Sequence, residues 1–145
     1  MLFKRVNRTD AESVFIVLQA NATGIAADDV VSLEVTAASV DGVKVIQPTT
    51  AGLGENLCVG IADAAIANGA YGLVQTFGYR STSRINTTGA SLTAGQAMGA
   101  VVAQDYLETK ASLSPAFLPA FVLLESAAST GTTQTVSRKI WIRTM

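Results

Sequence analysis

The sequence predicts a mainly β protein, a compact antiparallel β-barrel or sandwich-like single domain (residues 1–145) with at most one short helix. Three observations predict this fold class. Residues 14–18 form a run rich in β-branched and aromatic side chains, residues 31–36 alternate apolar and polar side chains, and glycine-containing turns separate the apolar segments. A chain of 145 residues is long enough to bury one core without disulfides or metal ions.

The N-terminal third is predicted to consist of strands joined by turns. The run at 14–18 is apolar at every position, which is typical of a strand covered on both faces. The alternation at 31–36 is typical of a half-buried strand. Asp-Gly at 41–42 favours a tight hairpin turn before a strand at 43–46, and Pro48, which lacks a backbone N–H, ends that strand.

A second group of strands is predicted in the middle of the chain. Residues 57–61 alternate as a strand does, and residues 63–69 are read as one short helical turn that ends with Gly69 in the left-handed region. A strand follows at 71–80, and the Ser- and Thr-rich residues 81–90 are predicted to be an exposed loop. The expected apolar face of the strand at 71–80 consists of Leu73, Phe77 and Tyr79.

Residues 91–110 fit two interpretations. Thr93 and Gln96 have the spacing of a helix capping box, and apolar residues follow at helical spacing. Gly95 and Gly99 each cost a helix about 1 kcal/mol relative to alanine. A helix and a short strand are therefore equally compatible with this segment.

The C-terminal part is predicted to contain a buried strand at 121–124, a turn of small residues at 126–134 and a final strand at 135–144. On the final strand, Val136, Ile140 and Ile142 share one face, and Lys139, Trp141 and Arg143 share the other.

One β-rich core is expected to gather apolar side chains from most of these strands. The predicted core residues are Phe15, Val17, Leu33, Val59, Phe77, Leu123 and Ile140. A weak internal echo is also present, because the segments that begin at Val59 and at Val122 both read as apolar strand, acidic residue, Ala-Ala, glycine and strand. It indicates one hairpin pattern used twice and is too short to indicate a solenoid or a propeller.

Composition excludes several classes of function. The chain has no histidine and a single cysteine, Cys58, which excludes a Ser-His-Asp triad, a His-ligated metal site, a redox Cys pair and an intrachain disulfide. A net charge of −1 argues against nucleic-acid binding through a broad basic face. No apolar run approaches the roughly 18 residues that span a bilayer, and no signal peptide is readable. We therefore expect no membrane partner.

No candidate catalytic or metal site stands out. Asp28 and Asp29 are adjacent carboxylates in a turn-like stretch and are interpreted as a solvated turn. Asp105 and Glu108 would share one face if residues 91–110 were helical, and are read as a solvated face. Cys58 has no cation nearby in the sequence that would lower the pKa of its thiol and is read as inert. We expect no catalytic residue, no metal and no cofactor.

The basic residues are more informative, because they gather near the two ends of the chain. With charged residues at only 14%, this composition suits a surface that partner subunits cover. An indole between cations is typical of an interface anchor. The residues predicted to bind a partner are Phe3, Lys4, Arg5 and Arg8 of a possible arm at residues 1–8, and Lys139, Trp141 and Arg143 of the last strand. Three alternatives remain. The basic residues could only protect edge strands from edge-to-edge aggregation, residues 1–8 could form a strand of the protein's own sheet, and Trp141 could pack beneath the basic side chains.

Two stretches, CVGIADAAIANGAYGLVQTFGYRS and AFVLLESAASTGTTQTVSRKIWIR, resemble the head decoration (cement) proteins of tailed bacteriophages. The resemblance covers about half of the chain and leaves out residues 14–46. It implies a compact β-rich fold, commonly trimeric, on the outer capsid where hexamers and pentamers meet. It implies no enzymatic activity and transfers no catalytic or binding residue.

The expectation is therefore a structural virion protein that stabilises a capsid from its exterior, with the major capsid protein and copies of itself, as a homotrimer, as partners. Such a protein would be made in the host cytoplasm. A tail or head–tail connector subunit is a second hypothesis. A small carbohydrate-binding β-domain that stacks sugars on Tyr71, Tyr79 and Trp141 is a third.

Overall fold

The computed structural model describes residues 13–21, 24–35, 42–48, 57–101, 103–109, 120–128 and 131–144. All regular structure in these ranges is β-strand, and the predicted mainly β barrel in a single domain is confirmed. The strands are β1 (Ser13–Ala20), β2 (Val30–Leu33), β3 (Lys44–Ile46), β4 (Cys58–Ala62), β5 (Tyr71–Arg80), β6 (Arg84–Asn86), β7 (Ala97–Ala100), β8 (Leu107–Thr109), β9 (Phe121–Leu123), β10 (Thr135–Ser137) and β11 (Ile140–Arg143).

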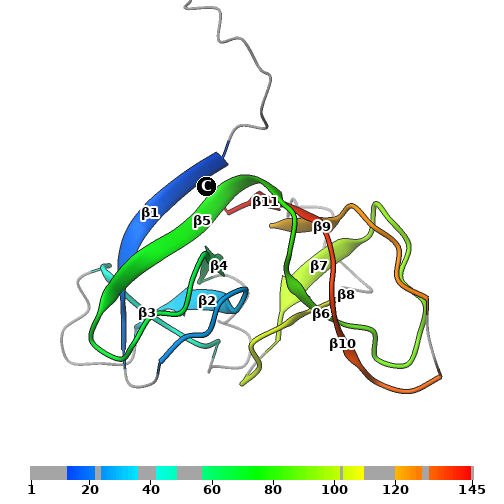
Figure 1. Cartoon of the computed structure of the whole chain (residues 1–145), viewed down its shortest axis with the longest axis horizontal. Helices are drawn as coiled ribbons and strands as arrows, with labels where there is room; N and C mark the ends of the chain where they lie inside the picture. The colour runs from blue at the N-terminus through cyan, green and yellow to red at the C-terminus, as the bar shows by residue number, and fades with distance from the viewer. Residues whose placement is uncertain are drawn as a thin grey trace, which may run out of the picture.

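The first five strands close into a barrel (Figure 1). Their order around the barrel is β1, β3, β2, β4 and β5, and β5 pairs back with β1 along almost its whole length. All pairs are antiparallel except β1 with β3. Because the ring closes, its long strands are hydrogen-bonded rather than left as open sheet edges.

The second half of the chain repeats this arrangement. Strands β6, β8, β7 and β9 follow one another as β1, β3, β2 and β4 do, including one parallel pair, β6 with β8. Strands β10 and β11 together take the place of β5, because β10 pairs with β6 as β5 pairs with β1, and β11 pairs with β9 as β5 pairs with β4. The two halves lie side by side in Figure 1.

The register of the strands shows that this repeat extends to single residues. Residue pairs in the first half have counterparts in the second. The pair Val31–Gly60 corresponds to Met98–Phe121, and Gln19–Tyr71 corresponds to Asn86–Thr135. The isolated bridge Ile25–Ile66 corresponds to the bridge Leu92–Ala127. The described part of the chain therefore contains the same β-unit twice, with five strands in the first copy and six in the second, where β10 and β11 replace β5. The sequence echo at Val59 and Val122 lies in the corresponding segments of the two units but is out of register with the structural repeat, in which Ile61 is the residue equivalent to Val122.

The two units are joined by antiparallel pairing of β5 with β11. Val74 and Ile140 are equivalent, since they pair in the same way with β4 and with β9. Three residues further along, Phe77 and Arg143 are equivalent and also pair with each other. A local two-fold axis therefore passes through the Phe77–Arg143 pair.

The structure has two hydrophobic clusters where the sequence predicted a single core. Residues at equivalent positions of the two units fill the two clusters. The first cluster contains Leu18, Ile25, Val31, Val45, Ala62, Ile66 and Val74. Their equivalents in the second cluster are, in the same order, Ile85, Leu92, Met98, Leu107, Leu123, Ala127 and Ile140. Val30 and Ile61 of the first unit pack into the second cluster. Burial of these two side chains links the units in addition to the β5–β11 pairing.

The predicted core is right for part of its members. Leu123 and Ile140 are fully buried. Leu33, Val59 and Phe77 are half-buried. Phe15 and Val17 are 40% and 59% exposed, so their assignment to the core was wrong. Strand β1 is covered on one face only, because it belongs to the wall of a single-layered barrel, and its inward side chains are Ile16, Leu18 and Ala20.

A β-bulge explains why the predicted face of β5 was also wrong. Between Val14 and Phe15 of β1 the pairing skips from Phe77 to Gln75, so Thr76 is an extra residue. Leu73 consequently shares a face with Gln75, whereas Phe77 points to the opposite side.

One predicted loop contains a strand, and three other local predictions are settled by the structure. Residues 81–90 include β6, and Ser83, Asn86 and Thr87 in this stretch are buried rather than exposed. Residues 91–110 hold β7 and β8, which settles the helix-or-strand alternative in favour of strands. Residues 63–69 form bends and the Ile66 bridge instead of a helical turn, although Gly69 has the predicted positive φ of 76°. The single final strand expected at 135–144 is divided into β10 and β11.

Candidate functional site

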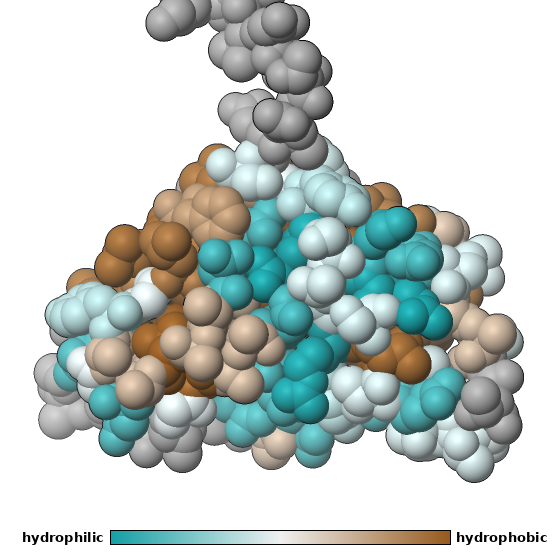
Figure 2. All heavy atoms as spheres, in the orientation of Figure 1, coloured by the Kyte–Doolittle hydropathy of each residue, from teal (hydrophilic) through white to brown (hydrophobic). Residues whose placement is uncertain are grey.

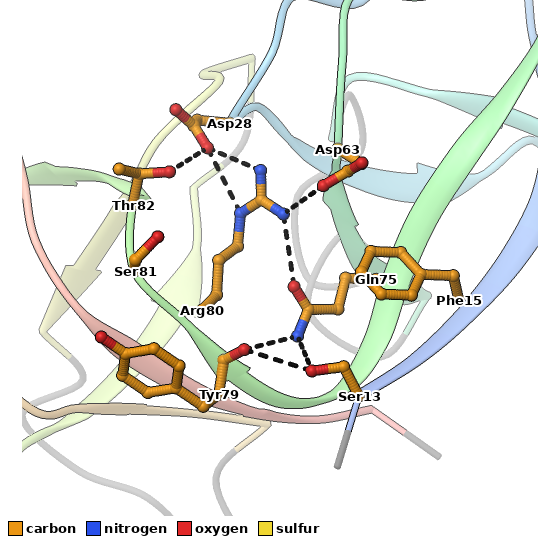
Figure 3. Close-up of a pocket in the computed structure, with 9 residues that line it drawn as sticks. All are labelled: Ser13, Phe15, Asp28, Asp63, Gln75, Tyr79, Arg80, Ser81 and Thr82. Atoms are coloured by element: carbon orange, nitrogen blue, oxygen red, sulfur yellow. Dashed lines mark hydrogen bonds and ion pairs between the residues drawn. The ribbon is translucent and has the colours of Figure 1, made fainter. Parts of the chain in front are cut away.

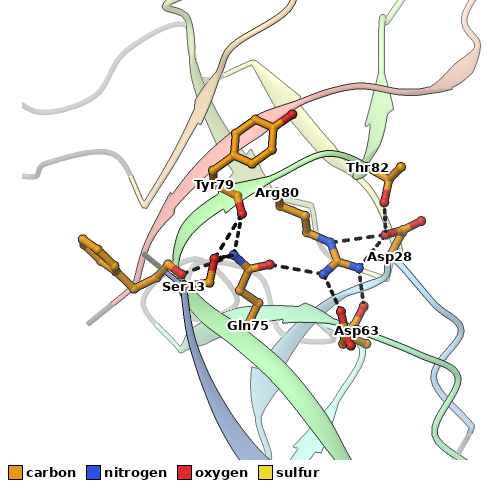
Figure 4. Close-up of polar contacts among 9 residues, drawn as sticks. Ser13, Asp28, Asp63, Gln75, Tyr79, Arg80 and Thr82 are labelled. Atoms are coloured by element: carbon orange, nitrogen blue, oxygen red, sulfur yellow. Dashed lines mark hydrogen bonds and ion pairs between the residues drawn. The ribbon is translucent and has the colours of Figure 1, made fainter. Parts of the chain in front are cut away.

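A polar pocket of about 320 Å³ opens beside the bend of β5 (Figure 3). Strands β1 and β5 form its walls, together with the turn before β2, the turn after β4 and the start of the β5–β6 connection. Its lining residues are Ser13, Phe15, Asp28, Asp63, Gln75, Tyr79, Arg80, Ser81 and Thr82. The ring of Tyr79 points away from the polar groups, so this residue contributes mainly its backbone (Figure 4).

The guanidinium of Arg80 lies at the centre of this pocket, and its side chain is only 8% exposed. Nε and Nη2 donate to Asp28 Oδ1 at 3.2 and 2.6 Å, and Nη2 also donates to the carbonyl of Ala62 at 3.0 Å. Nη1 donates to Asp63 Oδ1 at 3.1 Å and to Gln75 Oε1 at 3.3 Å. These five hydrogen bonds match the five N–H donors of an arginine. Arg80 therefore has no donor left for an anionic ligand.

The side-chain amide of Gln75 is equally occupied. Its Oε1 accepts from Arg80, and its Nε2 lies 2.9 Å from the carbonyl of Tyr79, 3.2 Å from that of Phe77 and 3.4 Å from Ser13 Oγ. These bonds hold the bulged part of β5, where the backbone carbonyls leave the regular ladder. The pocket is thus a hydrogen-bonded network that fixes the bend of β5.

A second ion-pair cluster continues from the first across the junction of the two units. Arg84 on β6 donates Nη1 to Asp29 Oδ1 at 3.0 Å and also forms an ion pair with Asp105, which precedes β8. Asp29 Oδ2 accepts from the backbone N–H of Ala26 at 2.7 Å. Burial raises the pKa of Asp29 above its ordinary value of 3.8, against the opposing effects of the Ala26 and Arg84 hydrogen bonds.

These contacts correct the interpretation of the acidic residues. Asp28 and Asp29 are not a solvated turn, because each holds one of the arginines that flank the β5–β6 connection, and Asp29 is buried. Asp105 and Glu108 do not share a helical face, since Asp105 lies in a turn and Glu108 lies on β8. The sequence features that could have indicated these ion pairs were the adjacent acidic residues Asp28 and Asp29 and the two closely spaced arginines, Arg80 and Arg84. Only the barrel topology brings Asp28 and Asp29 close to Arg80 and Arg84.

The C-terminal residues predicted to bind a partner lie on one strand. Trp141 is half-buried and packs edge-on against Phe77, with ring centroids 5.6 Å apart and an interplanar angle of 77°. Arg143 is half-buried, and Lys139, just before β11, is exposed. Trp141 pairs with Tyr79, and Arg143 pairs with Phe77, so these four side chains share one face of the sheet. Phe3, Lys4, Arg5 and Arg8 lie outside the described residues.

A second surface was not expected from the sequence. Phe15, Val17, Tyr71 and Leu73 are 40–62% exposed on neighbouring strands β1 and β5, where Val17 pairs directly with Leu73. Figure 2 shows hydrophobic side chains gathered over this part of the molecule and hydrophilic ones over its middle. We call these four residues the β1–β5 apolar face. This exposed face was not predicted from the sequence, because apolar residues on a strand are expected in the buried core.

In the described part of the chain, no group of three or more Cys, Asp and Glu side chains is placed to hold a metal ion. Within the same residues, no helix has the length and apolar character needed to cross a bilayer. Cys58 is half-buried at the start of β4.

Comparison with known proteins adds no family assignment, because no protein-family model and no curated protein sequence matches this chain.

Proposed function

We propose that this chain is a structural virion protein that binds the outer surface of a capsid as a decoration subunit. One observation carries the proposal. The polar groups at the centre of the Arg80 pocket are consumed by bonds within the protein, while aromatic and aliphatic side chains point outward from β1, β5 and β11. Such a distribution suits a protein that works through protein–protein contacts. The sequence resemblance to phage head decoration proteins supports the capsid as the partner.

The proposed coat-binding surface is the face that carries Trp141. Here the half-buried Trp141–Phe77 pair supplies a rigid aromatic anchor, while Arg143 and the exposed Lys139 bring positive charge to its rim. Aromatic and arginine side chains are the residues that dominate protein interfaces, and rim charges act mainly on the rate of association. Residues 1–8, with Phe3, Lys4, Arg5 and Arg8, are proposed as a second contact with the coat.

The carbohydrate-binding alternative loses its main support. Because of the bulge at Thr76, Tyr71 lies on the opposite side of β5 from Tyr79 and Trp141. The three aromatic side chains therefore cannot form one stacking platform.

Cosedimentation with expanded capsids tests the proposal. We expect the wild-type protein to bind capsids and to ignore free coat subunits, and Lys139→Glu to weaken binding at least fivefold with unchanged thermal stability. Ala64→Glu, which adds negative charge on an exposed turn of the first unit, is the control and should bind normally.

Removal of residues 1–8 is expected to lower capsid binding and to leave the melting temperature unchanged, because we propose that these residues contact the coat and not the protein's own sheet. A collapse in stability would instead show that these residues belong to the protein's own sheet. Unaltered capsid binding by both the deletion and Lys139→Glu would contradict the proposed coat-binding surface.

A further inference from the structure

The β1–β5 apolar face is not a requirement of the fold, and the second unit demonstrates this. The registers β1–β5 and β6–β10 make Val17 equivalent to Arg84, Leu73 to Ser137 and Tyr71 to Thr135. The same barrel is thus built with polar residues at the positions where the first unit exposes apolar ones. The apolar side chains of the first unit must have a role outside its own core.

The four residues of the β1–β5 apolar face carry no charge, and the charged side chains at its margins have opposite signs, because Lys44 pairs with Gln19 on one side and Asp63 lies beside Leu73 on the other. The outward positions of β1 are Ser13, Phe15, Val17 and Gln19, and those of the adjoining part of β5 are Tyr71 and Leu73. Two copies of such a face can meet with Lys44 of one copy towards Asp63 of the other, and Gln19 and the Tyr71 hydroxyl add uncharged polar groups to the rim. A uniformly charged partner surface would gain nothing from the four uncharged side chains, whereas a second copy offers an apolar face with margins of opposite charge.

The position of this face separates it from the proposed coat-binding surface. Val14 and Phe15 point to opposite sides of β1, Val14 pairs with Phe77, and Phe15 pairs with Gln75. The Phe77 and Trp141 side chains therefore lie on the other side of the sheet from the β1–β5 apolar face. One molecule can use both surfaces at the same time.

We propose that the β1–β5 apolar face binds a second copy of this chain and is the contact through which the protein self-associates. Contiguous exposed apolar patches of more than a few hundred Å² are rare on monomers, and with only 14% charged residues this chain has little else to keep copies apart. The inference identifies the surface behind the expected oligomer and does not depend on capsid binding.

Sedimentation equilibrium of the full chain tests the inference. The variant combines Val17→Arg, Tyr71→Thr and Leu73→Ser, so that each residue is replaced by the one at the equivalent position of the second unit. We expect the wild type to be an oligomer at micromolar concentration and the variant to dissociate at least tenfold more readily. Leu124→Ser removes a side chain that is 41% exposed outside this face and should leave the oligomer intact.

Thermal unfolding of each protein shows whether the substitutions are tolerated. If the triple variant does not fold, Val17→Arg alone carries the test. A monomeric wild type, or an oligomer that the variant leaves unchanged, would overturn the inference. Loss of capsid binding by a variant that remains oligomeric would assign the face to the coat protein and overturn it too. A wild-type oligomer that dissociates as expected but never binds capsids supports the inference and contradicts the proposed function instead.

Discussion

The two units of this protein share a hydrogen-bonding scheme and differ in what they do with their side chains. Both have the same strand order, the same parallel pair and equivalent core positions. The first unit fills its core with smaller residues such as Ala62 where the second has Leu123. Backbone pairing therefore defines the unit, and many side-chain combinations satisfy it.

The turns before β2 and before β7 are equivalent in the two units and use different side chains for the same hydrogen bond. In the first unit, Ala26 N–H donates to the side chain of Asp29, and in the second Thr93 N–H donates to the side chain of Gln96 at 2.8 Å. Asp28 has a positive φ of 67° in the first turn, and Gly95 has one of 93° in the second. A neutral amide and a glycine are sufficient for the turn. The carboxylates of the first turn are explained by Arg80 and Arg84.

The largest expected loss of stability comes from placing a core residue of the first unit at the equivalent position of the second unit. Leu123→Ala places at β9 the residue that Ala62 supplies at β4 and should lower the free energy of unfolding by about 2–5 kcal/mol, because the larger second core cannot collapse around the cavity. Urea denaturation measures the loss. Phe77→Ala is the half-buried comparison and should cost less. A loss below about 1 kcal/mol for Leu123→Ala would mean that the second cluster adapts freely.

A somewhat smaller effect is expected from removing the ion-pair network that only the first turn supports. Arg80→Met should lower the free energy of unfolding by about 3 kcal/mol, because it leaves Asp28, Asp63 and the Gln75 amide without their partner in a largely buried position. Arg80→Lys keeps the positive charge, loses the planar fork and should cost less. Equal losses in the two variants would show that the fork geometry matters more than the charge.

The smallest effect is expected for Asp29→Gln, which copies Gln96 into the first turn. The variant keeps an acceptor for Ala26 N–H and loses the attraction to Arg84, so its stability at pH 7 should lie within about 1 kcal/mol of wild type. Asp29→Ala, which leaves that N–H without its acceptor, should cost more.

The pH dependence of Asp29→Gln has a defined sign. Burial raises the pKa of Asp29 above 3.8, so the folded protein holds this proton more tightly than the unfolded chain does. The stability that the proton contributes is complete below pH 3.8 and is lost as the pH rises through the raised value. Relative to wild type, the variant should therefore gain stability between pH 3.8 and 7, as measured by urea denaturation at several pH values. The opposite trend would mean that the Arg84 attraction outweighs burial.

Much of the fold was predictable from local patterns. Period-2 alternation, β-branched runs and glycine positions located most strands, and Gly69 was placed correctly in the left-handed region. The repeat was not readable from the sequence, because equivalent core positions carry different side chains and the short echo at Val59 and Val122 is out of register with it. The Asp28 and Arg80 network was not predictable, since these residues lie far apart in the chain and meet only when the barrel closes.

By itself, the sequence determined the β class, the absence of histidine chemistry and the low surface charge, because these depend on composition and on the two-residue period of strands. Tertiary structure alone decided which face of β1 and β5 is buried. A strand such as Val14–Leu18 is apolar on both faces, and only closure of the barrel and the bulge at Thr76 determine which of them faces outward. A one-residue irregularity reverses the facing of every later residue in a strand, and local sequence does not encode where it falls.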